Sequence, residues 1–313
     1  MKLKLMLMLL LAVMLLVSAS CSGSSEIENN RLDTGVALAA TEKTVEKIGA
    51  LFDARIDGPA LPPDEKPDDE ICTDYVDTGL LRISYLSDVD ARLKLQVLKD
   101  GNSIAYNLKG DGSVEDFSLQ YGSGEYTARI MQNIKEDEYF VVTSKTFEVN
   151  LTDETVVYLN SVQNVNWDYD MKPIKDVRYI VSNALEGLED AKLLSGCSTD
   201  LYQYVIENIK YDNDKVFTLM YDYLPDIEKT YFEETGICYD YAALYGAMLR
   251  SLGIPAKLVK GYNLKNPDVY HAWNEVYIDG EWIVVDTTFD ASQPKNSQKM
   301  VKSSEDYAKV YEY

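Results

Sequence analysis

The sequence predicts an all-β domain followed by an α+β domain, both behind an N-terminal export segment. Between residue 71 and about residue 164, apolar and polar side chains alternate, which is typical of strands. After Trp167 the apolar period lengthens to that of helices, and alternating segments return near the end of the chain. A chain of 313 residues is long enough for two domains with separate cores.

The first 20 residues have the features of an export signal. MKLKLMLMLLLAVMLLVSAS combines two lysines, an apolar run and small residues at its end. Cys21 follows at once, with serines and a glycine behind it. This arrangement resembles a bacterial lipoprotein signal, in which the cysteine is lipidated and becomes the new N-terminus. We therefore expect a membrane lipoprotein that faces the outside of the cell, with cleavage after Ser20 and plain secretion as the alternative.

Residues 21–70 are expected to form a flexible tether between the lipid anchor and the first domain. The segment ends in PALPPDEKPDDE, which is rich in proline and acidic residues and therefore extended and poorly packed.

Residues 71–164 are expected to form a β-sandwich of immunoglobulin-like type. Five stretches read as short alternating strands that are divided by Asp-Gly and Gly-Ser turns: LLRISYL, LKLQVLKDG, SIAYNLKGDG, EYTARIMQNI and YFVVTSKTFEVNL. Such spacing without intervening helices favours a sandwich. No catalytic group stands out in this region, so its expected role is that of a spacer or binding module.

Residues 165–313 combine helical periods with strands. The expected helices are VRYIVSNALEGL, then STDLYQYVIENIKYD with Ser198 or Thr199 as its cap, then a third from Cys238 to Leu252. Apolar residues cover most of the third helix, which we therefore expect to be buried at the centre of the domain. The strands AKLVKGY, HAWNEVYI and EWIVVDTTF follow it.

Charge and cysteine content narrow the classes of function. The formal net charge of −22 gives a surface that repels nucleic acid, so nucleic acid is excluded as a partner. If Cys21 carries lipid, then Cys72, Cys197 and Cys238 remain, and an odd number implies at least one free thiol in an exported protein. A disulfide between Cys72 and Cys197 stays open.

No metal or organic cofactor is implied by these residues. The cysteines lack the short spacing of zinc ligands, and the chain has a single histidine.

The candidate chemistry lies in three residues of the last domain. Cys238 is at the N-terminus of the third helix, where unpaired amides and the helix dipole favour a thiolate. His271, the only histidine, opens a strand. If Asp279 and Gly280 form a two-residue hairpin turn, Asp286 faces Trp273 across the hairpin, and His271 lies diagonally from Asp286 at roughly 7 Å between Cα atoms.

Each of the three residues has an ordinary structural explanation when taken alone. A helix cysteine is usually a small core residue, a histidine is often a satisfied polar group, and an aspartate commonly ends a strand. Together they supply a nucleophile, a base and a group that orients the base, so catalysis is the favoured interpretation.

These motifs resemble a known family. GICYDYAALYGAMLRSLGIPAKLVKGY, HAWNEVYIDGEW and VVDTTFD are similar to the transglutaminase-like core of bacterial surface proteins and lipoproteins, over about Asn164 to Asp290. The resemblance implies a papain-like α+β fold, with the cysteine on a central helix packed against an antiparallel sheet. It also implies that Cys238 is the nucleophile, His271 the general base and Asp286 its partner.

The oxyanion donor departs from the family pattern. Eukaryotic transglutaminases use an upstream tryptophan, but here no tryptophan lies between Trp167 and Trp273, so Tyr231 is the candidate replacement.

The expected function is that of a cell-surface cysteine enzyme acting on amide bonds of peptides or proteins. An acyl-thioester on Cys238 would pass to water, giving a protease or amidase, or to an amine, giving a cross-linker. We favour hydrolysis, although the family contains both outcomes. The alternative is a non-catalytic surface module that binds peptide or cell-wall polymer.

Overall fold

The computed structural model describes residue 62 and residues 65–181, 192–220 and 222–313. The expected export signal (1–20), the lipidation site Cys21 and most of the expected tether (21–70) therefore lie outside the described residues. Within the described ranges, no helix is long and apolar enough to cross a lipid bilayer.

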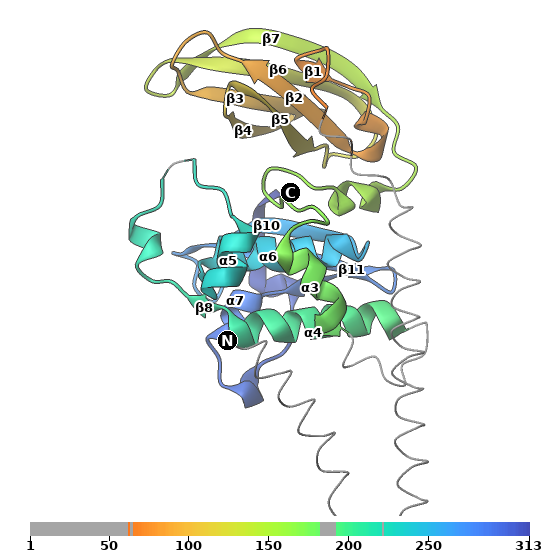
Figure 1. The fold of residues 1–313 in the computed structure, drawn as a ribbon, viewed down its shortest axis with the longest axis vertical. Coiled ribbons are helices and arrows are strands. Elements are labelled where there is room, and N and C mark those ends of the chain that lie inside the picture. The colour runs from red at the N-terminus through yellow and green to blue at the C-terminus, as the bar shows by residue number, and fades with distance from the viewer. Residues whose placement is uncertain (1–61, 63–64, 182–191, 221) are drawn as a thin grey trace, which may run out of the picture. The chain divides into compact units, whose positions relative to one another are not determined.

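The first part of the described chain is all-β (Figure 1). Seven strands form two antiparallel sheets, ordered β1-β2-β5 and β4-β3-β6-β7. Large side chains from both sheets, such as Leu81, Leu95, Phe117 and Tyr126, are fully buried. The strands are β1 (Ile71–Cys72), β2 (Leu80–Leu86), β3 (Leu93–Lys99), β4 (Asn102–Leu108), β5 (Asp111–Ser118), β6 (Gly124–Lys135) and β7 (Glu138–Val149). An all-β region is therefore present, and its immunoglobulin-like topology stays a prediction.

The second part is an α+β arrangement around one antiparallel sheet. The order of its strands is β13-β12-β11-β10-β14, and Figure 1 shows α6 lying along β10 and β11. The strands are β10 (Ala256–Asn263), β11 (Tyr270–Ile278), β12 (Glu281–Val285), β13 (Val301–Lys302) and β14 (Tyr307–Glu312). The helices are α3 (Lys172–Val181), α4 (Leu193–Asn208), α5 (Ile227–Glu233), α6 (Cys238–Ser251) and α7 (Thr287–Ala291). This mixed content is the α+β class expected from the sequence.

Helix α6 is buried on all sides, as its composition predicts. Its small and apolar residues from Ala242 to Leu249 are almost completely shielded from solvent. Asn274 of β11 donates to the carbonyl of Ala242 at 3.0 Å, which ties the helix to the sheet. A methyl group at Gly246 would lie 3.1 Å from the Asn274 amide nitrogen, so glycine permits this close approach. These contacts with the sheet therefore fix the position of α6 and of its first residue, Cys238.

An Asp-Gly turn sets the register of the β11–β12 hairpin. Asp279 and Gly280 both have positive φ, 54° and 87°, as a two-residue type I′ turn requires. The resulting pairs run from Ile278 with Glu281 to Asn274 with Val285. This is the register predicted from the sequence, and it brings the end of β12 close to the start of β11.

Helix α4 begins earlier than the sequence suggested. It starts at Leu193, so Ser198 and Thr199 lie inside the helix and neither caps it. Ser198 is fully buried, and its hydroxyl shares a hydrogen bond of 2.9 Å with the Tyr245 hydroxyl. An apolar stripe that already includes Leu193 and Cys197 extends the helix toward the N-terminus.

Cys72 and Cys197 are both buried and are not joined to each other, so the disulfide that the sequence left open is not formed. Cys238 is free and only partly buried. Among the described cysteines, Cys238 is therefore the one that reagents reach most readily.

Candidate active site

The turn that leads into α6 places Cys238 at the first position of the helix. Asp240 caps this end, because its Oδ2 accepts the amide of Ile237 at 2.8 Å and the ammonium of Lys215 at 2.6 Å. A methyl group on Gly236 would lie only 2.7 Å from the Asp240 Cβ, so glycine is needed beside this cap. Amides in the first helical turn have no acceptor within the helix, and Cys238 belongs to this turn.

His271 meets Asp286 across the β11–β12 hairpin. Its Nε2 lies 2.8 Å from the Asp286 Oδ2, and the imidazole stacks beside Trp273 with ring centroids 6.3 Å apart. Because Asp286 occupies Nε2, Nδ1 is the nitrogen left for a second partner. The Cys238 side chain acts on the imidazole through hydrogen bonding and charge. The structure thus brings Cys238, His271 and Asp286 together, and the His271–Asp286 pair follows from the register of the hairpin.

The Asp286 carboxylate is fully buried and held by three donors. Its Oδ2 accepts the Tyr307 hydroxyl at 2.9 Å as well as His271. Its Oδ1 accepts the backbone amide of Phe289 at 2.9 Å, which makes Asp286 the N-cap of α7. The cap and the tyrosine fix the carboxylate, and the carboxylate in turn fixes the orientation of the imidazole.

The environment of His271 favours the imidazolium form. Burial alone would lower the pKa of His271, but hydrogen bonds and negative charge from Asp286 and Cys238 outweigh it and raise the pKa to about 10. The unperturbed value is about 6.5. An imidazolium that persists at neutral pH is the form that stabilises a neighbouring thiolate.

The raised pKa predicts how stability depends on pH. A group whose pKa rises on folding contributes its full stabilisation below its unfolded pKa and loses it as pH approaches the folded value. We therefore expect the difference in unfolding free energy between wild type and His271→Gln to be greatest near pH 6 and to shrink between pH 6.5 and about 10. Urea unfolding at several pH values measures this difference, and a constant difference would contradict the prediction.

Tyr231, the expected oxyanion donor, is engaged elsewhere. Its hydroxyl donates to Asp176 of α3 at 2.5 Å, and its ring stacks on Tyr204 of α4. A different tyrosine approaches the nucleophile. Tyr211 lies on β8 (Lys210–Tyr211), which pairs in parallel with β9 (Thr235–Gly236), so that Tyr211 is opposite Gly236. Burial and then the charge of Cys238 raise the pKa of Tyr211.

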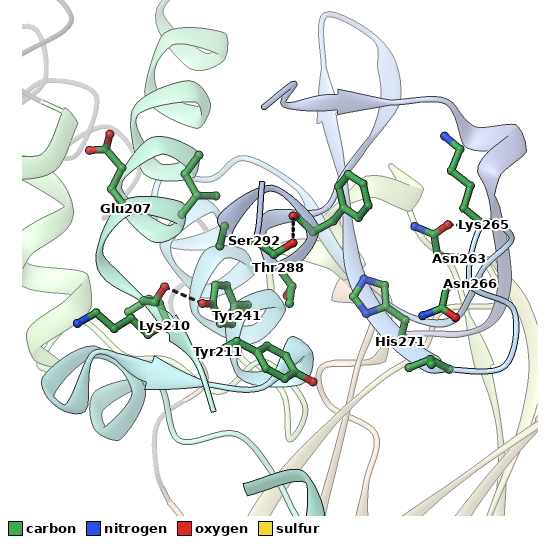
Figure 2. A pocket seen from close by; sticks show the side chains of 15 residues that line it. Glu207, Lys210, Tyr211, Tyr241, Asn263, Lys265, Asn266, His271, Thr288 and Ser292 are labelled. Atoms are coloured by element: carbon green, nitrogen blue, oxygen red, sulfur yellow. Dashed lines mark hydrogen bonds between the residues drawn. The ribbon is translucent and has the colours of Figure 1, made fainter. Parts of the chain in front are cut away.

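A cavity of about 640 Å³ opens beside these residues. Figure 2 shows Tyr211 and His271 among the side chains that line it, with Tyr241 of α6 and Thr288 of α7. The Tyr241 hydroxyl donates to the carbonyl of Ile209 at 2.6 Å, so Tyr241 presents mainly its ring to the cavity. The space therefore lies next to His271, with both apolar and polar side chains in its lining.

Sequence reasoning missed two tyrosines of the site, Tyr211 and Tyr307. Tyr211 is held opposite Gly236, two residues before Cys238, by a two-residue parallel strand pair, which leaves no periodic signal. Tyr307 comes from β14, whose partner is β10. Tyr211 lies within the stretch that the sequence predicts as a helix, and Tyr307 lies in a stretch for which it predicts no element.

Comparison with known proteins agrees with the geometry of the domain. Residues 181–287 match the model of the transglutaminase-like superfamily. Cytokinesis protein 3 of Schizosaccharomyces pombe (strain 972 / ATCC 24843) is 30% identical over 162 residues, which cover 46% of this chain and 17% of that protein. The present chain therefore corresponds to a small part of that relative's length.

Two solved structures are also similar. One is a candidate cysteine protease from Cytophaga hutchinsonii, with 16% identity, a TM-score of 0.38, and coverage of 75% of this chain and 79% of that one. The other is red sea bream transglutaminase, with 14% identity, a TM-score of 0.31, and coverage of 67% and 48%. On the strength of the family match, residues 181–287 of this chain belong to the transglutaminase-like superfamily.

Proposed function

We propose that this protein is a cysteine enzyme that cleaves or transfers the acyl group of peptide or protein amides. The observation that carries the proposal is the contact of one imidazole with a buried carboxylate at 2.8 Å and with the thiol at the start of a buried helix. A nucleophile, a base and a group orienting the base are the requirements for acyl transfer through a thioester. A pure binding module needs none of them.

The reaction would proceed in two steps. The Cys238 thiolate attacks the amide carbonyl carbon, and the tetrahedral intermediate collapses as the C–N bond breaks. The leaving amine takes its proton from the His271 imidazolium, which leaves an acyl-thioester and a neutral imidazole. Water or an amine, deprotonated by His271, then attacks the thioester, the C–S bond breaks, and the thiolate and imidazolium are restored.

Two donors are suited to the developing oxyanion. The backbone amide of Cys238 belongs to the first turn of α6, where amides have no acceptor within the helix. The Tyr211 hydroxyl is the second donor that we propose, because Tyr211 lies close enough to Cys238 for their charges to interact. Loss of one oxyanion donor typically slows catalysis by about 10²–10³.

Exposed apolar side chains on two segments of the second domain favour a polypeptide substrate. Phe217 and Met220 are 88% and 73% exposed on the segment after β8, and Lys215 ties that segment to the cap of α6. Tyr262 and Tyr270 contact each other near the tip of the β10–β11 hairpin and are also exposed. Apolar surface of this kind commonly marks binding sites for other proteins.

We propose that the thioester is hydrolysed by water. The reaction products distinguish hydrolysis from transfer to an amine. The protein would be incubated with a broad panel of peptides, with and without an added primary amine, and the products analysed by mass spectrometry. Hydrolysis adds the mass of water, whereas cross-linking joins two peptides with loss of ammonia. Cys238→Ala should abolish either product. The absence of any product across the panel would contradict the proposed activity.

We also propose that the enzyme acts at the cell surface as a lipoprotein, with the all-β region as an immunoglobulin-like spacer. The support is the export signal followed directly by Cys21. Cys21→Ala is expected to move the protein from the membrane fraction to the soluble fraction. If the wild-type protein is already found in the soluble fraction, the protein is secreted and is not anchored by lipid.

A further inference from the structure

A lysine that the proposed mechanism does not use lies at the start of α6, against the residue that follows Cys238. Lys260 is on β10, where it pairs with Ala272 of β11 and Tyr311 of β14. Its ammonium lies 3.5 Å from the ring centroid of Tyr239, the residue after Cys238, and 5.3 Å from that of Tyr313. A charged side chain is thus enclosed by aromatic rings at the start of α6.

Among the described residues, no carboxylate balances this charge. Throughout the described part of the chain, no acidic side chain forms an ion pair or hydrogen bond with the Lys260 ammonium. The nearby Asp240 is held by Lys215 and by the Tyr223 hydroxyl, and Asp286 is held by His271 and Tyr307.

The surrounding tyrosines do not supply a negative charge either. Burial raises the pKa of Tyr239 and of Tyr313 well above the usual value, and burial raises the pKa of Tyr270 to about 12. All three hydroxyls are therefore neutral at physiological pH. Their ring faces attract the ammonium but do not neutralise it.

Of the acidic groups in the described ranges, Cys238 is the one whose negative charge would act on Lys260 when the thiol is deprotonated. Burial lowers the pKa of Lys260 to about 8, and the charge of Cys238 acts in the opposite direction. An ammonium taken out of water without a partner is costly. A thiolate on Cys238 would offset this cost, and the offset is mutual because two interacting charges stabilise each other.

We propose that Lys260 is a positioning residue whose ammonium stands beside Cys238 and stabilises its thiolate. Its role differs from that of His271. The imidazolium gives up its proton to the leaving amine during the reaction, whereas the lysine keeps its charge through the cycle. The inference rests on the proposed role of Cys238 as the nucleophile.

The first test compares alkylation of Cys238 by iodoacetamide in three variants, with the label assigned by peptide mapping. Lys260→Met keeps the apolar stem and removes the charge, so at pH 6.5 alkylation is expected to slow by about tenfold, the effect of a change of one pKa unit in thiolate fraction. Lys260→Arg retains the charge and should stay within about threefold of wild type, since charge is what the role requires. Lys135→Met, which removes an exposed charge on β6, should have no effect.

A second readout is specific for charge and needs only the wild-type protein. Iodoacetate carries a negative charge and iodoacetamide does not, so a nearby ammonium favours iodoacetate. The ratio of the two rates is expected to fall as pH rises through about 8, where Lys260 loses its proton. His271 keeps its proton over most of this range because its pKa is about 10. If Lys260 only stabilised the fold, the ratio of the iodoacetate rate to the iodoacetamide rate would not change with pH.

The outcomes of these experiments distinguish the proposal that Cys238 is the nucleophile from the proposal that Lys260 stabilises its thiolate. If wild-type Cys238 reacts no faster than an ordinary thiol at pH 6.5, the proposed nucleophile is wrong and the role of Lys260 falls with it. A second outcome is that wild-type Cys238 reacts rapidly and that Lys260→Met has the same alkylation rate and the same ratio of iodoacetate to iodoacetamide rates. In that case Cys238 remains the proposed nucleophile and the role of Lys260 is overturned. If Lys260→Met does not fold, the wild-type ratio decides, and a ratio that stays flat from pH 7 to pH 9 overturns the inference.

Discussion

Replacing His271 with alanine is expected to slow alkylation of Cys238 at pH 6 by about two orders of magnitude. The imidazolium is the charge in direct contact with the thiol, and an ordinary cysteine with a pKa of about 8.5 is almost wholly protonated at pH 6. Cleavage of amide bonds should fall further, by about 10²–10⁴, because the variant also loses its general acid and base.

The measurement is the rate of iodoacetamide labelling as a function of pH, followed by peptide mapping. Cys72 and Cys197 are buried and should label slowly in the folded protein, and Cys238→Ala is the blank. His271→Ala should shift the rate profile towards that of a free thiol. A profile unchanged by the loss of His271 would mean that the two side chains do not act on each other.

Replacing Asp286 should have two effects that different substitutions separate. Asp286→Ala removes the N-cap of α7, which is worth about 0.5–2 kcal/mol, and leaves the half-buried Tyr307 hydroxyl without its acceptor, at a cost of about 1 kcal/mol. Asp286→Asn can still accept the Phe289 amide, so it should retain most of the stability. Both variants remove the negative charge that orients and stabilises the imidazolium, so both should lose about 10²–10⁴ in activity.

Tyr307→Phe is the matched control for Asp286. It removes one hydrogen bond to the same carboxylate oxygen and leaves the charge and the His271 contact in place. We expect a loss of about 1 kcal/mol in unfolding free energy and less than tenfold in activity. If Asp286→Asn were as active as wild type, the carboxylate would be a structural cap and nothing more.

The pairing of His271 with Asp286 was predictable because it depends on a local signal. An Asp-Gly pair between alternating segments specifies a two-residue turn, and the turn alone fixes which residues face each other. The burial of α6 was predictable for a similar reason, because apolar residues cover most of its surface. In both cases the information lies within a short stretch of sequence.

The remaining site residues come from contacts between distant segments. Tyr211 depends on the β8–β9 pair, Tyr307 on β14 lying against β10, and Lys260 on the packing of β10 beneath the start of α6. Strand pairs of two residues have no measurable period, and which tyrosine reaches the nucleophile is decided by tertiary packing. The choice of Tyr231 failed for this reason, since its hydroxyl is taken by Asp176 of α3.

The most direct test of the central claim is to trap the acyl group on Cys238. A peptide ester or amide that the enzyme consumes would be mixed with the protein, quenched in acid during turnover, and the protein digested and mapped by mass spectrometry. The account predicts one acylated peptide, the one that contains Cys238, which loses its acyl group in neutral hydroxylamine as a thioester does. Turnover of substrate with no acyl group on Cys238, or with the group on another residue, would contradict it.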